Sequence, residues 1–103
     1  MTVYHSLAGV YAAAVTPLQV DSSLDPTAIQ QLTDFLASHG CHGILFLGTT
    51  GEGPSFSPPE RAQIMRSAAQ ARHSHPTLHL LAGTGTPSLD ETIGLTRLAF
   101  DLG

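Results

Sequence analysis

Three short apolar segments recur along the chain, and each is followed by an amphipathic helical pattern. The apolar segments are Gly9 to Thr16, Gly43 to Gly48 and Thr77 to Ala82. Continuous apolar runs bounded by glycine or proline are typical of buried strands. Strands that alternate with helices in the order βαβαβα require a parallel sheet covered by helices. The pattern therefore limits the chain to an open doubly wound sheet or a (β/α)8 barrel, and by itself leaves both open.

The repeat has a regular spacing, and its helices carry recognisable start signals. Equivalent strand positions Val10, Ile44 and Leu78 stand 34 residues apart each time. The expected N-terminal caps are Asp25, which precedes a proline, and Ser57 and Ser88, each followed three residues later by a glutamate.

Two helices show a clear apolar stripe. In the first helix the stripe is expected to consist of Ile29, Leu32, Phe35 and Leu36, and in the third of Leu95, Leu98, Ala99 and Leu102.

Composition narrows the class of protein further. The 103 residues, 42% of them apolar and 12% charged, suit one small globular domain. Four arginines and no lysine stand against eight acidic residues, and the net charge of −4 argues against a nucleic-acid partner. The single cysteine, Cys41, favours a reducing compartment, so a cytoplasmic location is predicted. No segment reaches the roughly 20 apolar residues of a membrane span, and the apolar start from Leu7 to Val15 lacks the basic flank of a signal peptide.

The residues after each strand carry the chemistry, because ligands of parallel α/β folds bind at the carboxyl ends of the strands. The second strand runs into Gly48-Thr49-Thr50-Gly51-Glu52-Gly53, and the third into Gly83-Thr84-Gly85-Thr86. Threonine hydroxyls and amides in such turns can hold a carboxylate or a phosphate. For the Gly83 loop we prefer a structural explanation: its glycines allow a tight turn, and its threonine hydroxyls form hydrogen bonds with backbone groups. Glu52 is expected to fix its turn by accepting backbone amides rather than to act as a general base.

Histidines and the cysteine do not form a predicted site. His73, His75 and His79 lie close in sequence, but the bend at Pro76 separates them and no metal site is predicted. His39 and His42 flank the turn before the second strand, on the side away from the strand ends that bind ligands. Cys41 is expected to be a buried small hydrophobe.

Taken together, three strand ends give the chain a family resemblance. Val15-Thr16-Pro17, Gly48-Thr49-Thr50-Gly51-Glu52 and Ala82-Gly83-Thr84-Gly85 follow the three strands in order. In that order the segments closely resemble the N-terminal part of the dihydrodipicolinate synthase and N-acetylneuraminate lyase family, over nearly the whole chain. The resemblance implies the first three βα units of an incomplete (β/α)8 TIM barrel, with residues 1–103 as the N-terminal part of a single barrel domain.

The same resemblance implies an activity and the roles of two residues. Members of the family bind pyruvate or a related α-keto acid as a Schiff base on a lysine and form or break a carbon–carbon bond with an aldehyde partner. They need no further cofactor and usually assemble as homotetramers. Thr50 corresponds to the threonine that holds the keto-acid carboxylate, and Thr49 to a catalytic hydroxyl that relays a proton to a tyrosine.

The chain also departs from the family pattern. It contains no lysine, and its tyrosines are Tyr4 and Tyr11, of which Tyr11 falls in the first strand, where a packing role is expected. A complete barrel takes about 250 residues. The resemblance therefore implies a lyase whose lysine and tyrosine lie on later strands, with the 103 residues inactive alone.

Two other hypotheses remain: a non-catalytic module that binds small anions or assembles with other chains, and a chain with no function of its own. If the three units stand alone, their sheet edges and apolar side chains such as Ile44, Phe46 and Leu80 are expected to be uncovered.

Overall fold

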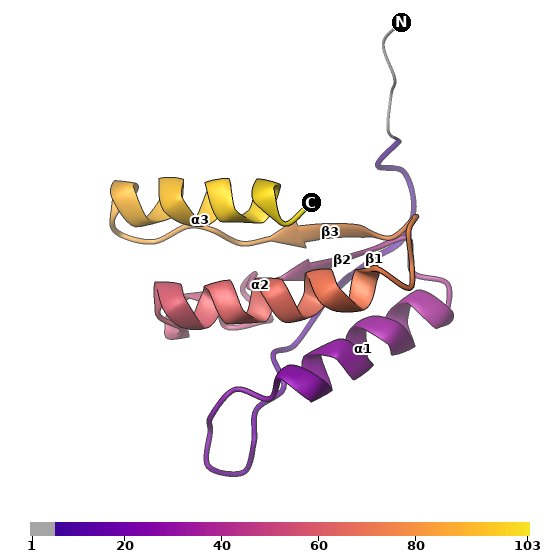
Figure 1. The fold of residues 1–103 in the computed structure, drawn as a ribbon, viewed down its shortest axis with the longest axis horizontal. Helices are drawn as coiled ribbons and strands as arrows, with labels where there is room; N and C mark the ends of the chain where they lie inside the picture. Colours follow the sequence, from indigo (N-terminus) through magenta and orange to yellow (C-terminus); the bar gives the residue numbers. More distant parts are fainter. Residues whose placement is uncertain (1–5) are drawn as a thin grey trace, which may run out of the picture.

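The fold alternates strands and helices as predicted. The computed structural model describes residues 6–103, so Tyr4 lies outside the described residues. The elements are β1 (Tyr11–Ala13), α1 (Pro26–Ser38), β2 (Gly43–Phe46), the 3-10 turn η1 (Gly53–Ser55), α2 (Pro58–Arg72), β3 (His79–Ala82) and α3 (Leu89–Asp101) (Figure 1). Each strand is shorter than its apolar segment, and η1 is the element that the sequence did not indicate. Within the described range, no helix is long and apolar enough to span a membrane.

The strands form one parallel sheet in the order β1-β2-β3. Ala12 pairs with Ile44, and Ile44 pairs with Leu80. The predicted equivalence of Val10, Ile44 and Leu78 is therefore wrong by two positions on both flanking strands. A shift of two residues keeps the same side chains on the same face, because strand side chains alternate with a period of two. The interpretation as a structural repeat still holds, but the spacing between paired strand positions is not constant.

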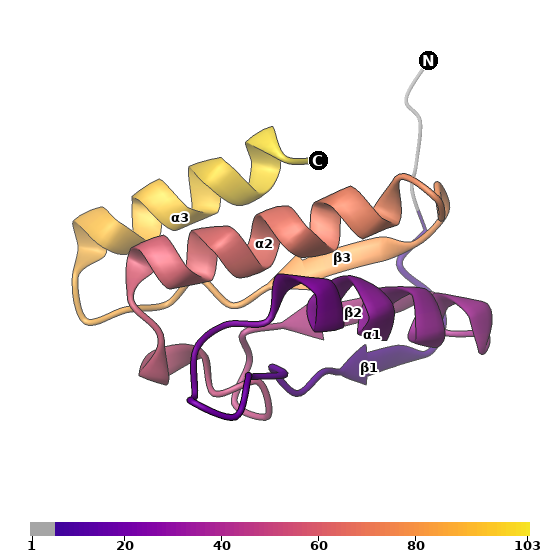
Figure 2. The same cartoon turned by 60° about the horizontal axis from the view of Figure 1, so that its bottom comes forward.

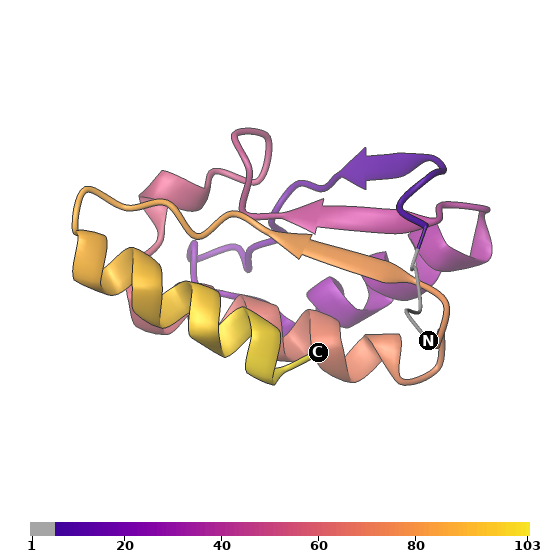
Figure 3. The ribbon, with the colours of Figure 1, turned by 90° about the horizontal axis from the view of Figure 1, so that it is seen from above.

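All three helices lie on one face of the sheet, and α2 lies between α1 and α3 (Figures 2 and 3). The core fills the space between the two layers. Its fully buried members include Ile44, Phe46 and Ile64. The expectation that Ile44 and Phe46 would be uncovered is wrong, because both side chains point toward the helices, and Leu80 is half-buried against the same core.

The opposite face of the sheet has no helix over it. The paired residues Ala13, Leu45 and Leu81 form one row on this face, and Leu81 is 42% exposed. The next row brings Tyr11 over Gly43, and the Tyr11 ring stacks on His79 with ring centroids 6.2 Å apart. The packing role expected for Tyr11 is confirmed. The open face is thus apolar in the row of Ala13, Leu45 and Leu81, and these residues differ from those predicted.

Helix α1 shows one error in the predicted stripe. Ile29 is buried, and Leu32 and Leu36 pack against the core, but Phe35 is 57% exposed. Thr33 takes the buried position, and its hydroxyl donates to the Ile29 carbonyl oxygen over 2.8 Å. That bond satisfies the hydroxyl within the helix, which lets a threonine replace an apolar residue at the core. The stripe predicted for α3 is confirmed, with Leu95 buried and the other three packed against the core.

The predicted helix starts are confirmed. Asp25 accepts from the Ala28 amide over 3.0 Å, and Ser88 accepts from the Glu91 amide over 3.3 Å. At α2 the capping box is complete: the Ser57 hydroxyl accepts from the Glu60 amide, and the Glu60 carboxylate accepts from the Ser57 amide over 2.9 Å. At α3 only the serine half of the box is formed within residues 6–103.

Candidate functional site

The carboxyl ends of the three strands are tied to one another by hydrogen bonds. Thr16, just beyond β1, is buried, and its hydroxyl donates to the Gly51 carbonyl oxygen over 2.7 Å. Beyond β3, the Gly83 amide donates to the Phe46 carbonyl oxygen over 2.8 Å. Both bonds join segments more than thirty residues apart in sequence. The turn after the central strand β2 is therefore held from both sides.

Leu47 gives that turn its shape. It is buried and has a φ of 61°, a left-handed conformation that is uncommon for a residue with a side chain. A Cβ atom at Gly53 or at Gly83 would clash with the Leu47 carbonyl oxygen. The two glycines are required here because backbone packs directly on backbone. Strained conformations of this kind persist where the surroundings over-determine them, and they cluster at functional sites.

Thr49 and Thr50 follow Leu47 after one intervening glycine, Gly48. Both threonines are exposed, and their hydroxyls make no hydrogen bond within residues 6–103. The backbone of Thr49 is nevertheless fixed, because its carbonyl oxygen accepts from the Glu52 amide over 3.1 Å. A fixed backbone with two exposed hydroxyls can bind a small anion, since each hydroxyl can donate a hydrogen bond to it.

Glu52 does not behave as predicted. Its carboxylate is exposed and accepts no backbone amide from the described chain, so the expectation that its side chain fixes the turn is wrong. Its backbone fixes the turn instead, with a φ of 55° and an amide bonded to Thr49. The exposed Glu52 side chain forms no cap hydrogen bond at the start of η1.

The threonines of the β3–α3 loop differ from Thr49 and Thr50 in their bonding. Thr84 accepts from the Thr96 hydroxyl over 2.9 Å. The Thr86 hydroxyl donates to the Ser88 carbonyl oxygen over 2.8 Å, and it accepts from the Ser88 amide. These hydroxyls satisfy the loop and the start of α3, which agrees with the structural explanation preferred for this loop. The candidate site therefore centres on the turn after β2.

The histidines and Cys41 lie away from this site. His42, which precedes β2, accepts from the Val10 amide at the amino end of the strands, and Cys41 is half-buried. His75 pairs with Asp34 of α1 over 2.9 Å, while His79 stacks on Tyr11. Within residues 6–103, no group of three His, Cys, Asp or Glu side chains is placed to hold a metal ion.

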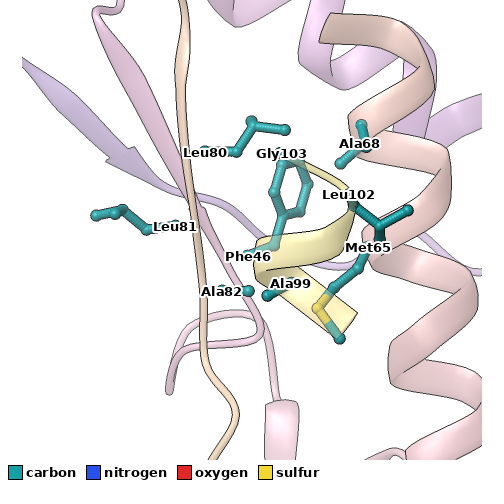
Figure 4. Close-up of a pocket in the computed structure, with 10 residues that line it drawn as sticks. Phe46, Met65, Ala68, Leu80, Leu81, Ala82, Ala99, Leu102 and Gly103 are labelled. Carbon is teal, nitrogen blue, oxygen red and sulfur yellow. The ribbon is translucent and has the colours of Figure 1, made fainter. Parts of the chain in front are cut away.

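An apolar pocket lies on the helix side of the sheet, between the strands and the helices α2 and α3 (Figure 4). Phe46, Met65, Leu80 and Leu102 contribute to its lining. All of its lining side chains are apolar, whereas ligand sites combine apolar walls with a few convergent polar groups. The pocket is a packing gap between layers rather than a second candidate site.

Two residues important for the site were not singled out by sequence reasoning. In the sequence Thr16 marks only a strand end, but in the structure its buried hydroxyl bonds to the turn. Arg61 is one of four arginines in the sequence, but in the structure it is 3% exposed. The spacing could have revealed it, because Arg61 stands three, four and seven positions before the core residues Ile64, Met65 and Ala68.

Comparisons with known proteins agree on one family. The model of the dihydrodipicolinate synthetase family matches residues 6–103. A 4-hydroxy-tetrahydrodipicolinate synthase from Herminiimonas arsenicoxydans is 38% identical over 95 residues, which cover 92% of this chain and 32% of that protein. The chain thus spans about a third of the length of the curated relatives it matches.

Solved structures share the fold. A prophage protein of the dihydrodipicolinic acid synthase family from E. coli K12, in complex with pyruvate, has a TM-score of 0.86 and 31% identity, over 94% of this chain and 32% of that one. An N-acetylneuraminate lyase from Mycoplasma synoviae has a TM-score of 0.85 and 29% identity, over 91% of this chain and 32% of that one. The predicted fold class, the first three βα units of a (β/α)8 barrel, is confirmed.

Proposed function

The chain belongs to the dihydrodipicolinate synthetase family, and on that basis we propose that it supplies the keto-acid carboxylate site of a carbon–carbon lyase. The observation that carries the proposal is the pair of exposed threonine hydroxyls on a fixed backbone at the carboxyl end of β2. Pyruvate presents a carboxylate next to its carbonyl, and convergent neutral donors suit such a group. The family relative from E. coli that was solved with pyruvate supports the choice of ligand.

The chemistry would combine this site with a lysine elsewhere in the complete protein. A primary amine condenses with the pyruvate carbonyl, takes up a proton and releases water, which leaves a positively charged iminium. The iminium accepts electrons when the methyl group loses a proton. The resulting enamine attacks the carbonyl carbon of an aldehyde, whose oxygen takes up a proton. Hydrolysis of the new iminium then frees the product and the amine. The reverse sequence of steps cleaves the same bond.

In this scheme the two threonines have different roles. The hydroxyl and amide of Thr50 hold the carboxylate throughout, so they bind the ground state and the transition state alike. Thr49 passes a proton between the reacting centre and a tyrosine of the complete protein. Homotetrameric assembly, from the family resemblance, and a cytoplasmic location, from the single cysteine, form part of the proposal as further expectations.

Steady-state kinetics of two isosteric variants of the complete protein test this division. Thr50→Val should raise the KM for pyruvate, and Thr49→Val should lower kcat, each by on the order of 100-fold. Thr27→Val is the matched control, because Thr27 is an exposed threonine on α1 at the helix side of the sheet. Identical kinetic profiles for the two variants, or wild-type behaviour in both, would contradict the assignment.

A further inference from the structure

Arg61 is a buried charge without a charged partner in the described chain. It occupies the first turn of α2, is 3% exposed, and has no carboxylate within ion-pairing distance among residues 6–103. An arginine guanidinium stays charged in proteins, and burying a charge is costly unless hydrogen bonds replace its water. The position therefore calls for an explanation beyond packing.

The hydrogen bonds of Arg61 join the loop between β2 and α2 to the loop between β3 and α3. Its Nε donates to the Phe56 carbonyl oxygen over 3.2 Å, in the segment between β2 and α2. Its Nη1 donates to the Gly85 carbonyl oxygen over 2.8 Å, in the loop between β3 and α3. The Phe56 amide in turn donates to the Gly53 carbonyl oxygen over 3.1 Å. One planar guanidinium thus holds the two loops at a fixed separation.

Both loops also pack against Leu47, which stands two positions before Thr49. Gly53 and Gly83 each approach the Leu47 carbonyl oxygen too closely to accept a Cβ atom. Movement of either loop would therefore release or displace Leu47. Since Leu47 leads within two residues to Thr49, such a movement would relocate the two hydroxyls.

We propose that Arg61 is a positioning residue for the keto-acid carboxylate site. The Nε and Nη1 atoms of its guanidinium form a planar fork that fixes the Phe56 and Gly85 carbonyl oxygens and thereby sets the positions of Thr49 and Thr50. This inference rests on the proposed function for its kinetic consequence and on the geometry alone for its structural one. It concerns the shape of the fork rather than its charge. A lysine at the same position keeps the charge but offers a single nitrogen in place of a planar fork.

The kinetic test uses Arg61→Lys and Arg61→Gln in the complete protein. Both variants should raise the KM for pyruvate by about 10- to 100-fold, because Thr50 is displaced, and they should also lower kcat, because Thr49 is displaced with it. The KM for the aldehyde should change less than about twofold, since the threonine pair does not bind it. Arg66→Gln is the matched control: Arg66 is exposed on the same helix and should behave as wild type.

The outcomes are distinct. A variant that merely loses folded protein shows a lower apparent kcat with both KM values intact, and that result would overturn the proposal. Wild-type pyruvate KM in Arg61→Lys would mean that charge alone matters, and would overturn it as well. If Arg61→Gln does not fold, Arg61→Lys decides the question.

A second readout separates failure of this inference from failure of the proposed function. In isotope-labelled protein without ligand, the amide resonances of Thr49, Thr50 and Gly85 should shift in Arg61→Lys, while those of α1 stay in place. If the wild type does not bind pyruvate, the proposed function fails. The amide resonances still test whether Arg61 sets the positions of Thr49 and Thr50. Unchanged Thr49 and Thr50 resonances in both variants would overturn the inference.

Discussion

At the scale of the residue, the shape of the site depends on one leucine and the glycines that enclose it. Leu47 adopts a left-handed backbone, and the Gly53 and Gly83 backbones pack against its carbonyl oxygen. Local strain of this kind costs on the order of 1–3 kcal/mol and is retained where the surrounding contacts leave no alternative. The exposed threonines that follow are placed by this buried backbone.

Alanine at Gly83 should therefore disturb both stability and the site. The new methyl group would clash with the Leu47 carbonyl oxygen, and such overpacking costs about 1–3 kcal/mol. Gly94→Ala is the matched control, since a Cβ there meets nothing within 4 Å on α3 and should stabilise the helix by up to about 1 kcal/mol. Urea unfolding and the pyruvate KM of the complete protein measure both effects. A Gly83→Ala variant as stable as wild type with an unchanged KM would contradict this account of the turn.

The sequence predicted a turn after the second strand but not the way that turn is built. The glycines around Thr49 and Thr50 indicated a turn open to ligands, and a turn follows β2, which ends at Phe46 rather than at Gly48. The contacts of Gly83 with Leu47 and of Gly51 with Ala14 join segments more than thirty residues apart, and no local pattern contains that information. The failed prediction for Glu52 has the same origin, because a side chain near free amides in sequence need not face them.

At the scale of the element, capping signals were the most reliable guide. Asp25, Ser57 and Ser88 all cap where predicted, because a cap needs only residues within one turn. The errors arose where distant packing decides. Phe35 lies outside the core although it is apolar, and Thr33 lies inside although it is polar, since its hydroxyl finds a partner within α1.

The capping box of α2 should make the start of this helix sensitive to acid. Hydrogen bonds from the Ser57 amide, and next from its hydroxyl, lower the pKa of Glu60 below its ordinary value. A lowered pKa in the folded state gives stability that is present above the ordinary glutamate pKa of about 4.3 and is lost as the pH falls through the folded value. The first turn of α2 is therefore expected to fray as the pH falls below the ordinary glutamate pKa.

Amide exchange at Ser57 and Glu60 across an acid titration measures this fraying. Glu60→Gln should remove the pH dependence, because the glutamine amide does not titrate and can still serve in a capping box. Ser57→Ala should cost about 0.5–2 kcal/mol at neutral pH. Ser74→Ala, in the exposed turn after α2, is the control. The account of the α2 start is wrong if Glu60→Gln leaves the acid sensitivity of this turn unchanged.

At the scale of the whole molecule, the chain presents one covered and one open face of a sheet. Helices cover the face of Ile44 and Phe46, whereas the row of Ala13, Leu45 and Leu81 has no cover within the described residues. Strands β1 and β3 each pair on one side only within this range. Unpaired edges and an apolar face favour association.

A polypeptide of these 103 residues alone should therefore associate, aggregate or pack loosely, and it should bind hydrophobic dyes. Sedimentation and dye binding on the purified polypeptide measure this. A sharp monomer with cooperative unfolding and no dye uptake would show a self-sufficient domain. That result would favour the hypothesis of a non-catalytic module that binds small anions over the hypothesis that these residues are part of a lyase.

The central claim is that Thr50 binds the carboxylate of a keto acid that is held as an imine on a lysine elsewhere in the complete protein. Borohydride trapping with pyruvate, followed by mass spectrometry, tests it most directly. The wild type should carry one reduced pyruvyl group on a lysine outside these 103 residues, and Thr50→Val should need on the order of 100-fold more pyruvate for the same yield. An adduct on a side chain within this segment, no adduct at all, or equal trapping in Thr50→Val and wild type would contradict the claim.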